Sequence, residues 1–83
     1  MNYCSPSIDD ATARIATLEA EIRATRDRLR NQLARVRAMR DEGVNIDLAC
    51  QLLRLLLQSL TALRALRDLE ISRREALIVY IRG

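Results

Sequence analysis

Histidine, lysine, tryptophan and phenylalanine are all absent from this chain of 83 residues, and its aromatic side chains are limited to two tyrosines. Without histidine and lysine, only Asp, Glu and Tyr remain as candidate general acids and bases, and no base is available to activate Ser or Thr. No glycine-rich segment is present that could hold a phosphate group. We therefore expect a protein that is not an enzyme and that uses no cofactor.

Helix breakers and metal ligands are also scarce. Pro6, Gly43 and Gly83 are the only prolines and glycines, so nearly the whole chain is free to form helix. The two cysteines, Cys4 and Cys50, are far apart in the sequence, and without histidine they provide too few ligands for a zinc site. We expect no bound metal and two reduced thiols, with Cys50 as a small core residue.

Long hydrophobic segments are missing as well. No run of about 18 uncharged apolar residues is available to cross a membrane. The segment from Met1 to Pro6 lacks the basic and then apolar pattern of a secretion signal. We expect a cytoplasmic protein without membrane insertion.

The chain does contain a seven-residue apolar repeat from Ile8 to Met39. One heptad position carries Ile8, Ile15, Ile22, Leu29 and Val36, and the other carries Ala11, Leu18, Thr25, Gln32 and Met39. A repeat sustained over five heptads is typical of a long helix that lies against another helix. Ser7 has the position of an N-cap, with Asp9 and Asp10 in the first turn. We expect a first helix over about residues 8–41.

A turn over about residues 42–46 ends this repeat. Gly43 can adopt the left-handed conformation that closes a helix, and Asn45 or Asp47 can cap the next one. A connection this short folds the second helix, about residues 47–82, back antiparallel to the first. The expected fold is all-α, an antiparallel two-helix hairpin that forms a single domain over residues 7–83, preceded by a flexible N-terminal tail at residues 1–6.

The C-terminal part of the second helix has two interpretations. Ser72 and Glu75 form a capping-box pattern, which favours a kinked or separate short helix at the C-terminus. The segment 78–81 is β-branched and aromatic, as in a short strand. We expect a continuous helix through Arg82, and helix or strand over residues 76–82 stays open.

The second helix is apolar on two sides, because ten leucines lie between Ile46 and Leu69. Helical spacing sorts them into two stripes, the first of which faces the first helix. The predicted hairpin core combines that stripe with the repeat of the first helix: Ile22, Leu29, Leu33, Val36, Leu53, Leu56 and Leu60. We expect the three core residues nearest the turn on the first helix to pack on the three leucines of the second.

The second stripe contains Leu48, Leu52, Leu55, Ser59, Ala62, Leu66, Leu69, Ala76 and Tyr80. One neighbouring helix cannot cover both stripes, so something else must cover this one. Its five leucines are the predicted partner-binding residues: Leu48, Leu52, Leu55, Leu66 and Leu69. We expect a protein–protein interaction module that binds a helical partner, copies of itself in a helical bundle, or both.

Nucleic acid is a less favoured partner. All fourteen basic residues are arginine, which codon bias can explain, and eleven acids reduce the net charge to +3. Arg23, Arg26, Arg30 and Arg37 lie along one side of the first helix, and Rop-like hairpins dimerise and bind RNA through such a face. Acids interrupt this stripe and no aromatic platform accompanies it. We expect a solvated face with ion pairs such as Glu19–Arg23 and Asp27–Arg30.

These features resemble a known family. The Arg-rich first helix ends in Leu33-Ala34-Arg35-Val36-Arg37, the Gly43 turn opens on Asp47, and the Leu-rich second helix ends at Leu69. Over roughly residues 11–69, this pattern is similar to the small co-chaperones of type III secretion needle subunits. The resemblance implies a bacterial, cytoplasmic chaperone or adaptor that holds an aggregation-prone helical subunit. Small helical antiactivators look similar at the same level, so a homo-oligomeric regulator remains an alternative. A Rop-like RNA-binding dimer also remains an alternative, because of the arginine stripe on the first helix.

Overall fold

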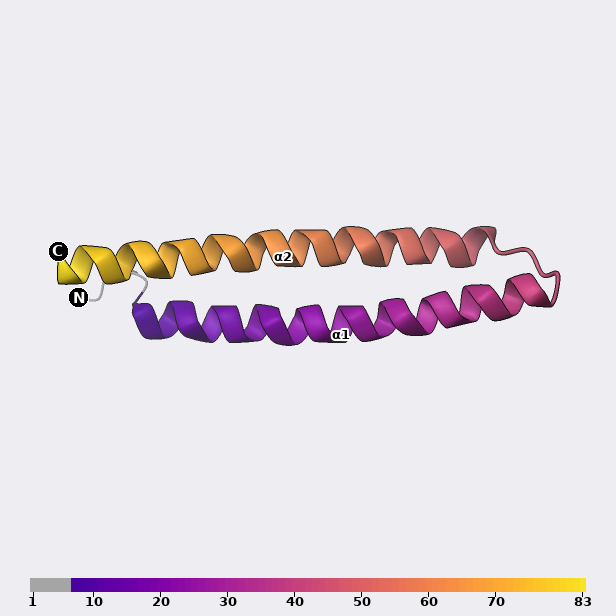
Figure 1. Ribbon diagram of the computed structural model, residues 1–83, viewed down its shortest axis with the longest axis horizontal. Coiled ribbons are helices and arrows are strands. Elements are labelled where there is room, and N and C mark those ends of the chain that lie inside the picture. The colour runs from indigo at the N-terminus through magenta and orange to yellow at the C-terminus, as the bar shows by residue number, and fades with distance from the viewer. Residues whose placement is uncertain (1–6) are drawn as a thin grey trace, which may run out of the picture.

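Two long helices joined by a short turn make up the computed structural model, which describes residues 7–83. Helix α1 spans Ile8–Asp41 and helix α2 spans Asp47–Arg82, and the described residues contain no strand. The helices run antiparallel along the whole molecule (Figure 1). The predicted all-α hairpin is therefore confirmed. The predicted flexible tail at residues 1–6 lies outside the described residues.

The start of α1 has the predicted cap. The Ser7 hydroxyl oxygen accepts a hydrogen bond of 3.0 Å from the backbone N–H of Asp10. Asp9 and Asp10 place negative charge in the first turn, where it interacts favourably with the positive end of the helix dipole.

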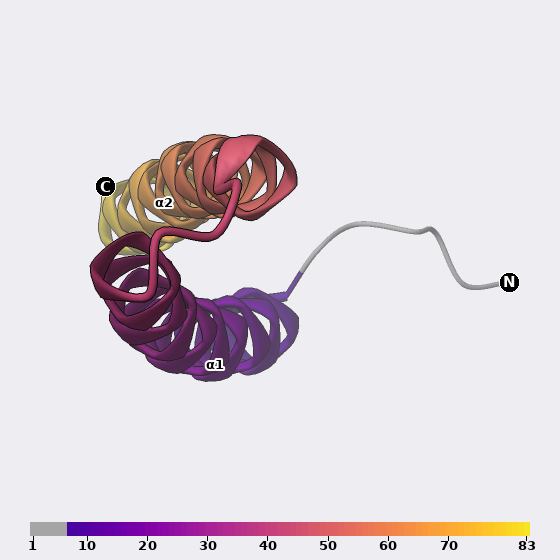
Figure 2. The same ribbon diagram turned by 90° about the vertical axis from the view of Figure 1, so that its right-hand side faces the viewer.

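The turn is closed by Gly43, whose φ is +73°. Its N–H donates to the carbonyl of Arg40 at 3.0 Å, and the N–H of Val44 donates to the carbonyl of Met39 at 2.9 Å. These two bonds are the Schellman arrangement, in which a left-handed residue satisfies the last carbonyls of a helix. Asn45 Oδ1 then accepts from the backbone N–H of Asp47 at 2.9 Å and opens α2. Figure 2 looks along the hairpin from this turn and shows the helices crossing at an angle.

The core is a single seam between the helices. On α1 it follows the heptad repeat, and the buried residues are Ala11, Ile15, Ile22, Thr25, Gln32 and Val36. On α2 the buried residues are Ala49, Leu60 and Glu70. The Gln32 side-chain amide donates 2.9 Å to the carbonyl oxygen of Ala49, so the buried polar group keeps a partner.

Three contacts between the helices define their register. Gln32 meets Ala49 near the turn, Arg14 meets Glu70, and Arg74 donates to the Thr12 hydroxyl at 3.4 Å near the open end. Between the first two contacts, this register places Leu29 at the level of Leu53 on α2. The same register places Val36 beside the start of α2 and Leu60 near Ile22. Both therefore lie outside the expected cluster, in which Leu29, Leu33 and Val36 pack on the three leucines of the second helix. The difference arises because each residue of α1 faces a residue of α2 that lies closer to the turn than expected.

Helix α2 continues through Ser72 as one helix, so the separate C-terminal helix and the strand are not observed. Ser72 is exposed within the helix, while Leu77 and Ile78 are half-buried. Neither helix contains a segment apolar enough over a sufficient length to cross a membrane.

We predict that Leu60→Ala destabilises the fold by about 2–5 kcal/mol, because Leu60 is only 6% exposed and its truncation leaves a cavity. Leu57→Ala is the matched control, since Leu57 lies three residues away on the same helix and is 48% exposed. Urea denaturation followed by circular dichroism measures both free energies of unfolding. Equal losses in the two variants would contradict the assignment of the core seam.

We predict that Gly43→Val destabilises the fold by about 1–2 kcal/mol, because an L side chain is strained in the left-handed region. No atom lies within 4 Å of the position that a Cβ would occupy, so the cost comes from the backbone conformation alone. Gly43→Asn should cost less, since Asn tolerates this conformation better than a β-branched residue. Thermal unfolding of the two variants should rank them in that order.

Candidate protein-binding face

A continuous stripe on α2, here called the outer seam, lies beside the seam that faces α1 and is exposed. Its ten residues repeat at alternating spacings of four and three: Leu48, Leu52, Leu55, Ser59, Ala62, Leu66, Leu69, Arg73, Ala76 and Tyr80. All ten are exposed. This spacing is that of a coiled-coil seam, so α2 carries one seam toward α1 and a second one toward solvent.

The structure separates the two groups of residues expected from the sequence. Among the predicted core residues, Ile22, Val36 and Leu60 are buried, and the others, Leu29, Leu33, Leu53 and Leu56, are half-buried. The predicted partner-binding leucines are all exposed, with exposed fractions from 45% at Leu52 to 81% at Leu48. The role of the exposed leucines in binding a partner stays a prediction.

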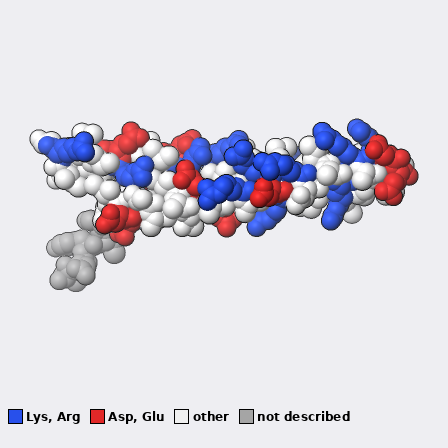
Figure 3. All heavy atoms as spheres, turned by 60° about the horizontal axis from the view of Figure 1, so that its bottom comes forward, with Lys and Arg blue, Asp and Glu red and all other residues white. Residues whose placement is uncertain are grey.

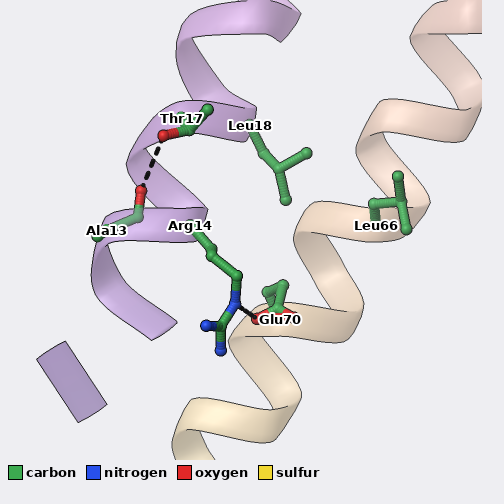
Figure 4. Close-up of a pocket in the computed structure, with 6 residues that line it drawn as sticks. All are labelled: Ala13, Arg14, Thr17, Leu18, Leu66 and Glu70. Carbon is green, nitrogen blue, oxygen red and sulfur yellow. Dashed lines mark hydrogen bonds and ion pairs between the residues drawn. The ribbon is translucent and has the colours of Figure 1, made fainter. Parts of the chain in front are cut away.

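Two hollows lie where the outer seam meets α1. The larger, of about 450 Å³, is lined by Ala13, Arg14, Thr17 and Leu18 from α1 and by Leu66 and Glu70 from α2. Leu18 extends between the helices, and Arg14 reaches across to Glu70 at one end (Figure 4). The second, of about 270 Å³, is lined by Arg28, Asn31, Gln32, Arg35, Leu52 and Leu56. The outer seam is thus bordered on one side by arginine side chains of α1.

Glu70 is a buried carboxylate at the edge of the larger hollow, and it is only 8% exposed. Arg14 Nε donates to its Oε2 at 2.9 Å, and Arg73 Nη1 donates to its Oε1 at 3.3 Å. The hydrogen bond from Arg14 lowers the pKa of Glu70 below its ordinary value of 4.5, against the opposing effect of desolvation. The charges of Arg14 and Arg73 lower this pKa further.

This ion pair was not identified from the sequence, although one signal for it exists. Glu70 follows Leu56 and Leu63 at steps of seven residues, so it continues the seam that faces α1. A carboxylate at such a position requires a cation from the opposite helix, because burial of an unpaired charge is costly. Arg14 provides that cation at the register observed.

Arginines and acids are both spread over the face drawn in Figure 3, and acids gather at its right-hand end. A hollow of about 230 Å³ on α1 is lined by Arg23, Arg26, Asp27 and Arg30. Asp27 accepts from Arg30 at 3.3 Å, which confirms the ion pair expected from helical spacing. Glu19–Arg23, also expected, is not among the ion pairs of residues 7–83, because exposed side chains at helical spacing need not meet.

Cys50 is a half-buried free thiol. Within residues 7–83, no three side chains of the metal-ligating types come together. Cys4 lies outside the described residues.

Comparisons with known proteins find no matching family model, no matching curated protein and no matching solved structure.

We predict that the Glu70 ion pair makes the stability of the fold depend on pH. Because the folded-state pKa of Glu70 lies below 4.5, the pair stabilises the fold above that pH. This stabilisation is lost as the pH falls through the lowered pKa. Glu70→Gln should therefore have a lower Tm near neutral pH and a smaller fall in Tm on acidification than the parent protein.

Glu75→Gln is the control for this measurement, since Glu75 is an exposed carboxylate on the same helix and forms no ion pair within residues 7–83. Its Tm should follow that of the parent protein over the acid range. The assignment would be wrong if Glu70→Gln and the parent protein lost the same Tm on acidification.

Proposed function

We propose that this protein is a non-catalytic protein–protein interaction module, a small chaperone or adaptor that binds an apolar helix of another protein along the outer seam. The observation that supports this most directly is the exposure of the five predicted partner-binding leucines on one stripe of α2. A helix that is apolar on two sides needs two neighbours, and the hairpin provides only α1.

The free energy available on the seam is adequate for specific binding. Complete burial of a leucine contributes roughly 1.5–3 kcal/mol, so covering five leucines that are about half exposed contributes on the order of 5 kcal/mol from this chain. The apolar side chains of the partner helix contribute a similar amount. Association costs several kcal/mol of this total. The remaining free energy corresponds to a complex in which the seam provides most of the binding and other contacts add to it.

Charge beside the seam favours a particular kind of partner helix. Arg28 and Arg35 line the smaller hollow next to Leu52 and Leu56, and both arginines are exposed. A partner helix lying on the seam at this point would bring its flanking residues close to the two guanidinium groups. Acidic residues at those flanking positions would pair with them, whereas lysine or arginine would be repelled.

The likeness in pattern to type III secretion co-chaperones supports the same role. Such a chaperone would cover the apolar face of a helical subunit that otherwise aggregates. The antiparallel hairpin is compatible with this role, and the outer seam is the surface that would perform it.

We predict that Leu52→Glu with Leu66→Glu abolishes partner binding and leaves the hairpin helical. The two leucines are 45% and 50% exposed, so carboxylates there remain hydrated in the free protein but are desolvated in a complex. Tagged protein expressed in the native host should recover a stoichiometric helical protein, and the double variant should not. Circular dichroism of the variant measures whether the helices are retained.

The matched control is Leu57→Glu, because Leu57 is 48% exposed but lies about 200° around α2 from Leu55 at about 100° per residue. It should recover the partner as the parent protein does. Recovery by all three proteins would place the binding surface elsewhere, and unfolding of the double variant would place these leucines in the core.

A further inference from the structure

We propose that the outer seam also binds a second copy of this chain, with the two α2 helices antiparallel and Leu66 of one copy packed on Ala62 of the other. The inference rests on the proposed function only in using the same seam, and it names the occupant of that seam when no other protein covers it. The spacing of four and three residues continues over all ten seam positions, so two identical seams can mesh along their full length.

The order of large and small side chains favours antiparallel pairing about the middle of the seam. Full overlap pairs Leu48 with Tyr80, Leu52 with Ala76, Leu55 with Arg73, Ser59 with Leu69 and Ala62 with Leu66. Each small residue therefore faces a leucine of the second copy. The combined volume of the two facing side chains then varies little from one of these pairs to the next, which favours close packing between the two helices.

Other pairings of the same two seams fit less well. A shift by one heptad places Leu52 against Leu69 and Leu55 against Leu66, but it leaves Ser59 against Ala62 as an underfilled layer between the leucine layers. A parallel pairing places every residue opposite itself. Arg73 would then face Arg73 of the second copy, and the small residues would face one another.

Charge on α2 presents no obstacle to the antiparallel pairing. The residues that border the seam on the side away from α1 are all uncharged: Gln51, Gln58, Ala65, Ser72 and Val79. The single charged residue of the seam, Arg73, already donates to Glu70 at 3.3 Å. In the antiparallel register its aliphatic stem would cover Leu55 while its guanidinium group keeps that bond. No like charges on the two α2 helices are brought together.

The geometry of α2 leaves room for both neighbours. At 100° per residue, the outer seam lies roughly 100° around α2 from the seam that faces α1, so a second α2 does not displace α1. From Leu48 to Tyr80 the seam is about 50 Å long, and a helix about 10 Å wide covers on the order of 500 Å² of each copy. The total of about 1,000 Å² is near the lower limit for a specific interface. We therefore expect a dimer that exchanges with the monomer.

Disulfide trapping tests this register in the full chain. In a background of Cys4→Ser and Cys50→Ala, protein carrying Ala62→Cys is mixed with protein carrying Leu66→Cys and oxidised gently. The proposed pairing brings these two positions into one layer, so a mixed disulfide should form at least about tenfold faster than between copies carrying Leu57→Cys, which lies off the seam. Circular dichroism checks that each variant is helical.

The pair Ser59→Cys with Ala62→Cys reports the shifted register. Faster trapping of this pair than of Ala62→Cys with Leu66→Cys would overturn the proposed register. Leu57→Cys trapped as fast as the seam pair would overturn the assignment of self-association to the seam.

Sedimentation equilibrium of the parent protein separates this inference from the proposed function. We expect a monomer–dimer equilibrium in the micromolar range, which Leu52→Glu with Leu66→Glu shifts to monomer and Leu57→Glu does not. A parent protein that is monomeric at every concentration, but still recovers its partner, would overturn the self-pairing alone. A dimer that persists in the double variant, together with unchanged partner recovery, would overturn both.

Discussion

A hairpin of two helices gives each helix only one neighbour, and this constraint governs the rest of the structure. Helix α1 satisfies this constraint, because its apolar residues form a single heptad seam and its other faces are charged. Helix α2 does not, because a second heptad seam lies outside the core with its leucines about half exposed. The asymmetry between the helices is therefore the main feature of the molecule, and it places most of the exposed apolar surface of residues 7–83 on α2.

Polar groups inside the seam determine how the two helices align. Leucine and isoleucine layers tolerate a shift of one heptad, whereas a buried amide or carboxylate is satisfied in one register only. Gln32 finds the carbonyl of Ala49 near the turn, and Glu70 finds Arg14 toward the open end. A slip of one heptad would break both interactions and leave two buried polar groups without partners. These residues therefore contribute to the uniqueness of the hairpin more than to its net stability.

Local signals in the sequence were sufficient to predict the elements. The heptads from Ile8 to Met39, the Ser7 cap and the left-handed Gly43 each depend on neighbouring residues only, and each is present as expected. The pairing between the helices depends on how many residues the turn contains. The sequence alone therefore did not predict that Val36 lies beside the start of α2. The exposure of the second stripe and the buried position of Glu70 were predictable from helical spacing. The partner of Glu70 was not, because Arg14 lies 56 positions away in the sequence.

Sharing one seam between a second copy and a partner helix would couple solubility to function. An uncovered leucine stripe of this length favours aggregation, and a dimer that covers it would keep the free protein in solution. A dimer near the lower limit of interface size can still dissociate, so a partner helix with acidic residues beside Arg28 and Arg35 could displace the second copy. The arginines of α1 would then favour that heterologous helix, because its acidic residues form ion pairs with them.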